Sequence, residues 1–384
     1  MDKKIYLDSA STTYINSEVL AEMMPVLTSQ MGALDGINSF SRESNELVSK
    51  ARRRLAKAIG ARSSEIHFTS SASQANKMAI IGLAHANQDK GKHIITSKVE
   101  DLSILSACKQ LESEGFKVTY IPVDDKGVIK LSSLMHEIKK DTILVSMQIA
   151  NGDVGTIQNL NAIARTVKER DIIFHCDATF AFGNINLDVR DLNIDAMTIS
   201  SNQIYGPNAG ALYVKKEVKF ENELGDESQS VANIVGFGKA VELASQNITI
   251  NAQKTRSLRE YFNKKVMESI ENTHIIGHAH QRLPNISTLS FEFVNAEPLA
   301  YMLDMEGIAV KAYSACLDKN LKANHVLTAM DLNPQLLNTV VRFSFAKNIT
   351  REEIDYVVEK LVKIVKKLRE ISPLHISVVE KESK

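Results

Sequence analysis

The sequence predicts an α/β protein with a large lobe, built on a mainly parallel seven-stranded sheet, and a smaller α+β lobe. Short apolar segments alternate with segments of helical periodicity through most of the chain, which is typical of a parallel sheet covered by helices. From about Asn251 onward, the order changes to a long helix, two strands and a last helix. We therefore expect residues 15–250 to form the large lobe, and residues 1–14 and 251–384 to form the small lobe.

Local patterns place the individual elements in order. Leu47, Ala51, Leu55 and Ala58 recur at helical spacing and predict a helix with one buried stripe before the first strand of the sheet. Further strands are expected at residues 286–291 and 340–345, and a capping box starts the last helix at Thr350. The seven strands of the large sheet are expected at residues 66–69, 93–97, 118–121, 143–147, 172–176, 197–200 and 211–214.

Composition argues against several classes of partner. The 46 basic residues equal the 46 acidic residues, so no net field attracts nucleic acid or an anionic membrane. No apolar run approaches the roughly 18–20 residues of a membrane span, and the first residues are unlike a signal peptide. Cys108, Cys176 and Cys316 are widely spaced and odd in number, which favours reduced thiols in a cytoplasmic protein.

Ligands of open α/β sheets collect at the carboxyl ends of the strands, so the segments that follow the predicted strands are the candidates for a binding site. Residues 71–73 lie between a predicted strand and a helix N-terminus, where free amides and the helix dipole favour an anion. The alternative is a polar helix cap formed by Ser71. Asp177 follows another strand, where a lone aspartate serves either as a loop cap or as a ligand group.

Several motifs together resemble the NifS/IscS-type cysteine desulfurases of the class V aminotransferase family, and the resemblance covers essentially the whole chain. The family's enzymes have the fold-type I architecture of pyridoxal phosphate (PLP) enzymes. The resemblance therefore implies that fold, a PLP pocket, a homodimer and an IscU-like scaffold or another sulfur acceptor as partner. The motifs are YLDSASTT at 6–13, FTSSASQAN at 68–76, ANGDVG at 150–155, HCDA at 175–178, SSNQIYGP at 200–207, SAC at 314–316 and VRFSFAK at 341–347.

Roles can be carried over from the family only at matching positions. The resemblance implies that Arg342 binds the substrate carboxylate, and Lys347 keeps a second positive charge nearby. It also implies that Cys316 receives sulfur as a persulfide, or serves as a ligand of an iron–sulfur cluster. The residues implied to line the PLP pocket are Ser71, Ala72, Ser73, Asn151, Asp177, Ser200, Asn202 and Gln203.

The chain departs from the family where the chemistry is most demanding. Gln203 stands where the family has the lysine that holds PLP as a Schiff base, and Asn202 replaces the preceding histidine. An amide nitrogen delocalises its lone pair, so it cannot condense with an aldehyde or act as the base. Asp101 replaces a histidine that stacks on the PLP ring, and we expect it to cap a helix instead. Phe180 replaces a glutamine that hydrogen-bonds the ring hydroxyl.

Three functions are compatible with this pattern. The favoured one is a desulfurase-like pseudoenzyme of sulfur mobilisation and iron–sulfur cluster assembly, with no covalently bound cofactor and with Cys316 as persulfide acceptor or cluster ligand. PLP would then be vestigial or held non-covalently. The first alternative is an active PLP-dependent desulfurase that uses another lysine, with Lys347 as the only candidate carried by a motif. The second is a structural subunit that forms a heterodimer with an active paralogue.

Overall fold

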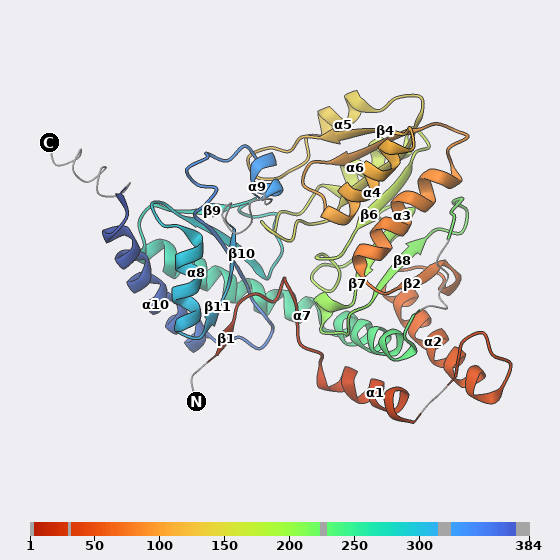
Figure 1. The fold of residues 1–384 in the computed structure, drawn as a ribbon, viewed down its shortest axis with the longest axis horizontal. Coiled ribbons are helices and arrows are strands. Elements are labelled where there is room, and N and C mark those ends of the chain that lie inside the picture. Colours follow the sequence, from red (N-terminus) through yellow and green to blue (C-terminus); the bar gives the residue numbers. More distant parts are fainter. Residues whose placement is uncertain (1–3, 30–31, 223–228, 314–323, 374–384) are drawn as a thin grey trace.

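The computed structural model describes residues 4–29, 32–222, 229–313 and 324–373. Within this part of the chain, the large sheet has seven strands in the order β2-β8-β7-β6-β5-β3-β4 (Figure 1). Strand β8 runs antiparallel to the other six, so the predicted α/β class and the mainly parallel sheet are confirmed. The strands are β2 Ile66–Thr69, β3 His93–Ser97, β4 Lys117–Ile121, β5 Thr142–Gln148, β6 Ile173–Asp177, β7 Ala196–Ser200 and β8 Gly210–Val214.

The ends of two strands differ from the prediction in a way that matters for the site. Strands β5 and β6 each continue one residue further than expected, to Gln148 and Asp177. Parallel pairing holds them together to the end, with Gln148 opposite Asp177. Both residues are polar, so the apolar pattern stopped before the backbone pairing did. Asp177 is therefore fixed at the carboxyl edge of the sheet.

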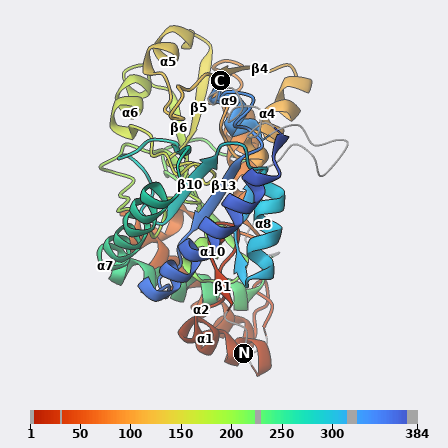
Figure 2. The same ribbon diagram turned by 90° about the vertical axis from the view of Figure 1, so that its left-hand side faces the viewer.

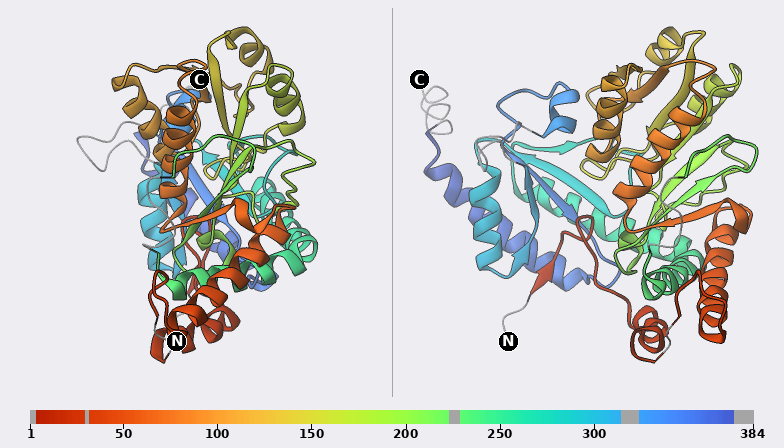
Figure 3. Two further views of the ribbon diagram at one scale, coloured as in Figure 1. Left: turned by 90° about the vertical axis from the view of Figure 1, so that its right-hand side faces the viewer. Right: turned by 45° about the vertical axis from the view of Figure 1, so that its right-hand side comes forward.

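Both faces of the large sheet are buried. Ile94 and Leu144 pack on one face, whereas their chain neighbours Ile95 and Val145 pack on the other, as the two-residue period of a strand requires. Helices α3 (Ala72–Ala86) and α4 (Leu102–Ser113) cover the first face. The second face is covered by α2, α6 and part of α7 (Figure 3, left). The remaining elements of this lobe are α1 Ser17–Thr28, α2 Ser39–Ala58, η1 Ser63–Glu65, α5 Leu131–Glu137, α6 Leu160–Lys168 and η2 Asn202–Ile204.

Helix α7 joins the two halves of the molecule and begins earlier than expected. It runs from Val231 to Ser269, whereas the sequence placed its start near Asn251. Its first part packs against α1 and α2 and its last part against α10, so one continuous helix serves both cores (Figure 1). The predicted lobe boundary at residues 250/251 falls inside this helix. The division of the chain into two lobes at these residues stays a prediction.

The C-terminal part contains a second sheet and a second apolar core. Its antiparallel strands have the order β12-β13-β10-β9 in the described chain, and α8 and α10 lie over one face (Figure 2). Ile5 pairs with Ile308 and joins the same core, which ties the N-terminus to this half. The predicted capping box of α10 is confirmed, since Thr350 and Glu353 exchange hydrogen bonds. The elements are β1 Ile5–Tyr6, β9 Thr273–Ile276, β10 Ile286–Phe291, α8 Ala296–Met305, β11 Ile308–Ala309, β12 Lys311–Tyr313, α9 His325–Ala329, β13 Val340–Ser344 and α10 Arg351–Glu370.

Among the described helices, none combines the length and the hydrophobicity that crossing a membrane requires.

Candidate functional site

A cavity of about 430 Å³ lies at the carboxyl edge of the large sheet, between β3, β5 and β6 and the end of β12. Asn151 and Asp177, both predicted to line a pocket, lie on it. Its other polar or aromatic walls include Glu100, Asp101 and Phe180 from the large sheet, and Tyr313, Asn324 and His325 from the C-terminal half. The predicted residues Ser71, Ala72, Ser73, Ser200, Asn202, Gln203, Arg342 and Lys347 do not line this cavity.

Asp177 and Asn151 are both held by neighbouring protein groups. One carboxylate oxygen of Asp177 accepts a hydrogen bond from Asn76 Nδ2 at 2.8 Å, and the other accepts from the backbone N–H of Thr179 at 2.8 Å. Burial raises the pKa of Asp177 in spite of these bonds. Asn151 Oδ1 accepts from the backbone N–H of Asp153 at 2.9 Å, which shapes the loop after β5. Asn76 belongs to the motif at 68–76, but the sequence alone did not indicate this contact.

Glu100 is a buried acid that sequence analysis missed. Its side chain is fully buried, Ser97 donates to Oε1, and Oε2 has no partner among the described residues. Burial raises the pKa of this carboxyl group well above its ordinary range, which favours the protonated form. Asp101 caps α4 by accepting from the backbone N–H of Ser103 at 2.8 Å, as predicted. A buried acid beside a helix cap has no local sequence signal.

Phe180 occupies space beside the loop after β5. A Cβ atom added at Gly152 would lie 2.3 Å from two carbons of the Phe180 ring, so the ring packs directly on the Gly152 backbone. Position 152 therefore requires glycine as long as Phe180 keeps this place. An aromatic ring now fills a part of the site where the resemblance implies a hydrogen-bonding glutamine.

Ser71, Ala72 and Ser73 form the start of α3, away from the cavity described above. Ser71 is the N-cap, and its hydroxyl accepts from the backbone N–H of Gln74 at 3.2 Å. The backbone of β8 approaches closely, because a Cβ atom at Gly210 would lie 2.4 Å from the Ser71 carbonyl carbon. The helix cap is thus confirmed. Anion binding by the first amides of α3 stays a prediction.

Gln203 is turned toward the N-terminal segment. Its Nε2 donates to the backbone oxygen of Ala10 at 3.0 Å, and the hydroxyl of Thr13 donates to the backbone oxygen of Asn202 at 2.5 Å. Asn202 Oδ1 also accepts from the Thr12 hydroxyl at 3.3 Å. Residues 10–13 therefore lie on η2. Ser200, the last residue of β7, is buried in the sheet opposite Gly210.

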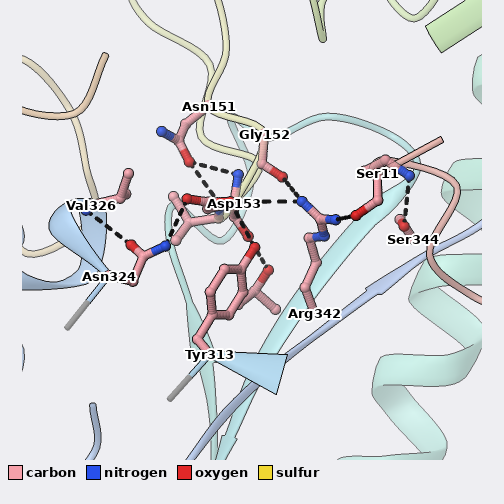
Figure 4. A network of polar contacts seen from close by, with 12 residues as sticks. Ser11, Asn151, Gly152, Asp153, Tyr313, Asn324, Val326, Arg342 and Ser344 are labelled. Atoms are coloured by element: carbon pink, nitrogen blue, oxygen red, sulfur yellow. Dashed lines mark hydrogen bonds and ion pairs between the residues drawn. The ribbon is translucent and has the colours of Figure 1, made fainter. Parts of the chain in front are cut away.

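Arg342 lies between the two halves and is bound by groups of the protein itself (Figure 4). Its Nη2 donates to Asp8 Oδ1 and to Ser11 Oγ, each at 2.7 Å, and its Nη1 donates to the Gly152 oxygen at 2.9 Å. Burial opposes its charge, but Tyr313, Asp153 and Asp8 raise the pKa of Arg342 overall. Only 4% of the side chain is exposed, so a substrate carboxylate would have to compete with these bonds.

Asp153 is the second charge of this network, and sequence analysis assigned it no role. Its Oδ1 accepts from the Tyr313 hydroxyl at 2.7 Å, and its Oδ2 accepts from Asn324 Nδ2 at 3.0 Å (Figure 4). The Arg342 guanidinium lies 3.7 Å away. Tyr313 and Asn324 flank residues 314–323, so Asp153 holds the chain on both sides of that segment. Cys316 lies within the segment, outside the described residues.

Lys347 is separated from Arg342. It lines a different cavity, which it shares with Gln203 and Tyr205. Its ammonium group lies 4.4 Å from the centroid of the Tyr205 ring, and burial lowers the pKa of Lys347. The two residues predicted to bind a substrate therefore have different surroundings. Their separation of only five residues in the sequence gave no sign of this difference in surroundings.

The described cysteines and acids offer no metal centre. Cys108 and Cys176 are free and buried, and burial raises the pKa of both thiols, to about 12 for Cys108. Such thiols remain protonated and unreactive near neutral pH. Within the part of the chain that the structure describes, no group of three histidine, cysteine or acidic side chains is placed to hold a metal ion. A cluster ligated by Cys316 stays a prediction.

The residues of this site do not fit a covalently held PLP. Position 203 carries no amine, and its carboxamide is bonded to Ala10. Asp101 offers no aromatic face for stacking, and Phe180 offers no hydrogen bond. We therefore assign no reaction step to PLP.

Comparisons with known proteins agree with the fold and the motifs. The aminotransferase class-V family matches residues 5–225 and 221–357. The chain is 41% identical over 386 residues to the cysteine desulfurase IscS of Clostridium botulinum strain Hall, and 39% identical over 383 residues to that of Dictyoglomus turgidum. Each alignment covers 97% of this chain and 97% of the relative.

A solved structure described as a NifS-like protein superimposes with a TM-score of 0.88 at 30% identity, covering 95% of this chain and 100% of that one. This likeness extends the agreement from the sequence to the arrangement of both sheets. The chain thus belongs to the NifS/IscS-type cysteine desulfurases of the class V aminotransferase family, with glutamine where the family's motif carries its lysine.

Proposed function

We propose that this protein handles sulfur in iron–sulfur cluster assembly without PLP-dependent activity of its own. The observation that carries the proposal is the Gln203 side chain, which donates through Nε2 to the Ala10 oxygen at 3.0 Å. An amide at this position supplies neither the covalent link nor the base that releasing sulfur from cysteine requires. The link to sulfur chemistry comes from the relatives named cysteine desulfurase IscS, at 39–41% identity.

The proposed sulfur carrier is Cys316. Its thiolate would attack the outer sulfur of a persulfide on a donor protein, and the donor cysteine would leave as a thiolate. One S–S bond breaks and one forms, so the transfer needs no external oxidant or reductant. Lys319 and Lys322 follow Cys316 in the sequence, and an ammonium group close to a thiol favours its thiolate form. Tyr313 and Asn324, on either side of the segment, both line the large cavity.

The proposal also concerns the partners. An IscU-like scaffold protein is the expected recipient of the sulfur, and a thiolate at position 316 would suit a shared iron–sulfur cluster equally well. We propose that the protein acts as a homodimer in the cytoplasm, and a heterodimer with an active paralogue is the alternative assembly. In that second case the chain contributes structure alone, and Cys316 is dispensable.

The first experiment tests whether the protein is an enzyme. Purified protein is incubated with PLP and L-cysteine, and both the visible absorbance of bound PLP and the formation of alanine are measured. We expect no retained absorbance after gel filtration and no alanine. Alanine formation that disappears in Lys347→Met would show that this amine replaces the missing lysine and would refute the proposal.

The second experiment tests Cys316. A persulfide donor protein carrying labelled sulfur is mixed with wild type, Cys316→Ser or Cys108→Ala. The last variant is the matched control, since the Cys108 thiol is buried. We expect label on wild type and on the Cys108 variant, and none on the Cys316 variant. Equal labelling of all three proteins, or of none, would leave the structural-subunit function as the better account.

A further inference from the structure

A second cavity, of about 160 Å³, lies between η2, the N-terminal segment and the middle of α7, and is separate from the cavity at Asp177. Its walls come from distant parts of the chain and include Ser9, Gln203, Asn251 of α7 and Lys347. Helix α7 reaches both halves of the molecule, and this cavity adjoins its middle part.

The polar groups of this cavity are unusual because several lack partners. The Lys347 ammonium makes no hydrogen bond or ion pair within the described chain, and its contact is the face of the Tyr205 ring at 4.4 Å. Ser9 Oγ and Asn285 Oδ1 are buried atoms that also have no hydrogen-bond partner among described residues. Ser9 is only 5% exposed. Leaving such groups unsatisfied is unfavourable, and all three residues line this one cavity, which suits a polar occupant.

The types of group define the chemistry of that occupant. The Lys347 ammonium lacks a hydrogen-bonded anion, and the Asn285 oxygen lacks a hydrogen-bond donor. Glu18 is the one acid among the described walls of the cavity; its charge raises the pKa of Lys347 against the larger effect of burial, but its carboxylate is paired with Lys239 at 3.4 Å. A phosphate dianion would meet a single cation here, since Lys347 is the one basic side chain among the described walls of the cavity. A carboxylate that also carries a hydroxyl or an amino group satisfies both requirements, and the volume restricts it to a small molecule.

We propose that this cavity binds a small hydroxy- or amino-carboxylate, with Lys347 holding its carboxylate and Asn285 and Ser9 its hydroxyl or amino group. The proposal is independent of the function proposed for Cys316, because no residue of this cavity takes part in sulfur transfer. It also gives Lys347 a role apart from Arg342, which is already bound to Asp8.

The test is a ligand-observed NMR titration of the full chain with glycolate, acetate and inorganic phosphate. We expect glycolate to bind saturably, acetate to bind about two- to tenfold more weakly because it lacks the hydroxyl, and phosphate to bind more weakly still. Lys347→Met should weaken glycolate binding by about tenfold or more, whereas Lys347→Arg should retain most of it. Lys109→Met removes the same charge from the exposed face of α4 and should bind like wild type.

Each other outcome contradicts the proposal. Absence of saturable glycolate binding to wild type would show that the cavity holds only water. Equal binding to wild type and Lys347→Met would place the ligand elsewhere, and preferential binding of phosphate would exclude a carboxylate site. Asn285→Ala keeps the test decisive if the Lys347 variants fail to fold, since it should remove the preference for glycolate over acetate.

Discussion

Replacing Glu100 by glutamine is expected to change how stability depends on pH. Burial raises the pKa of this carboxyl group well above its ordinary value of 4.5, against the hydrogen bond from Ser97, which lowers it. In the unfolded chain the group loses its proton near the ordinary value, while in the folded protein it keeps the proton to a higher pH. Between these two pKa values the folded state binds more protons, so stability falls as pH rises.

The size of the effect on stability is set by one proton. When a single group is protonated only in the folded state, the free energy of unfolding falls by about 1.4 kcal/mol for each unit by which the pH rises. Glutamine has the same shape, still accepts from Ser97 and does not titrate. The Glu100→Gln protein should therefore match wild type near the ordinary pKa and become progressively more stable than wild type as pH rises, until the folded-state pKa is reached.

Urea unfolding at about pH 5.5 and about pH 6.5 measures this difference, which should approach 1.4 kcal/mol between the two conditions. The exposed Glu169→Gln protein is the matched control, because it loses a carboxyl group from the surface without altering this site. Parallel stability curves for wild type and Glu100→Gln would show that Glu100 ionises normally, and would refute the burial argument.

Three further predictions concern neighbouring contacts. Asp153→Asn and Tyr313→Phe should each destabilise the protein by about 1–3 kcal/mol in urea unfolding. A double-mutant cycle of the two should give a coupling energy of about 0.5–3 kcal/mol. Additive effects would contradict the hydrogen bond between Tyr313 and Asp153. Gly152→Ala should destabilise by about 1–3 kcal/mol through collision with Phe180, and less in a Phe180→Ala background; equal effects in both backgrounds would contradict that contact. Gln203→Lys alone should form no alanine from cysteine in the presence of PLP, and turnover by this single variant would show that the rest of the site is intact.

The fold was predictable because its signals are local. The seven strands of the large sheet were found from short apolar runs, since a strand buried on both faces is apolar at consecutive positions. The caps at Asp101 and Thr350 were found because a cap needs only a side chain and the turn that follows it. The start of α7 was missed by about 20 residues, from Asn251 to Val231, because its helical pattern passes without interruption between two cores.

The site was less predictable because its contacts join distant residues. Arg342 and Asp8 are 334 positions apart, and Asp153 and Asn324 are 171 apart, so no sequence window contains either pair. The motif at 341–347 predicted a substrate role for Arg342 and Lys347, which stays a prediction; the structure shows that the first lies within β13 and the second beyond its end. The burial of Glu100 also depends on which loops fold over it.

The positions at which this chain departs from the family's motifs make contacts within the protein. Asp101 stabilises the start of α4, Phe180 packs on Gly152, and Gln203 joins η2 to the N-terminal segment at Ala10. Each replacement therefore adds a contact within the protein at a position where the family's motif has a group directed at a ligand. Because each of these contacts joins protein groups to one another, the substituted side chains contribute to the stability of the fold itself.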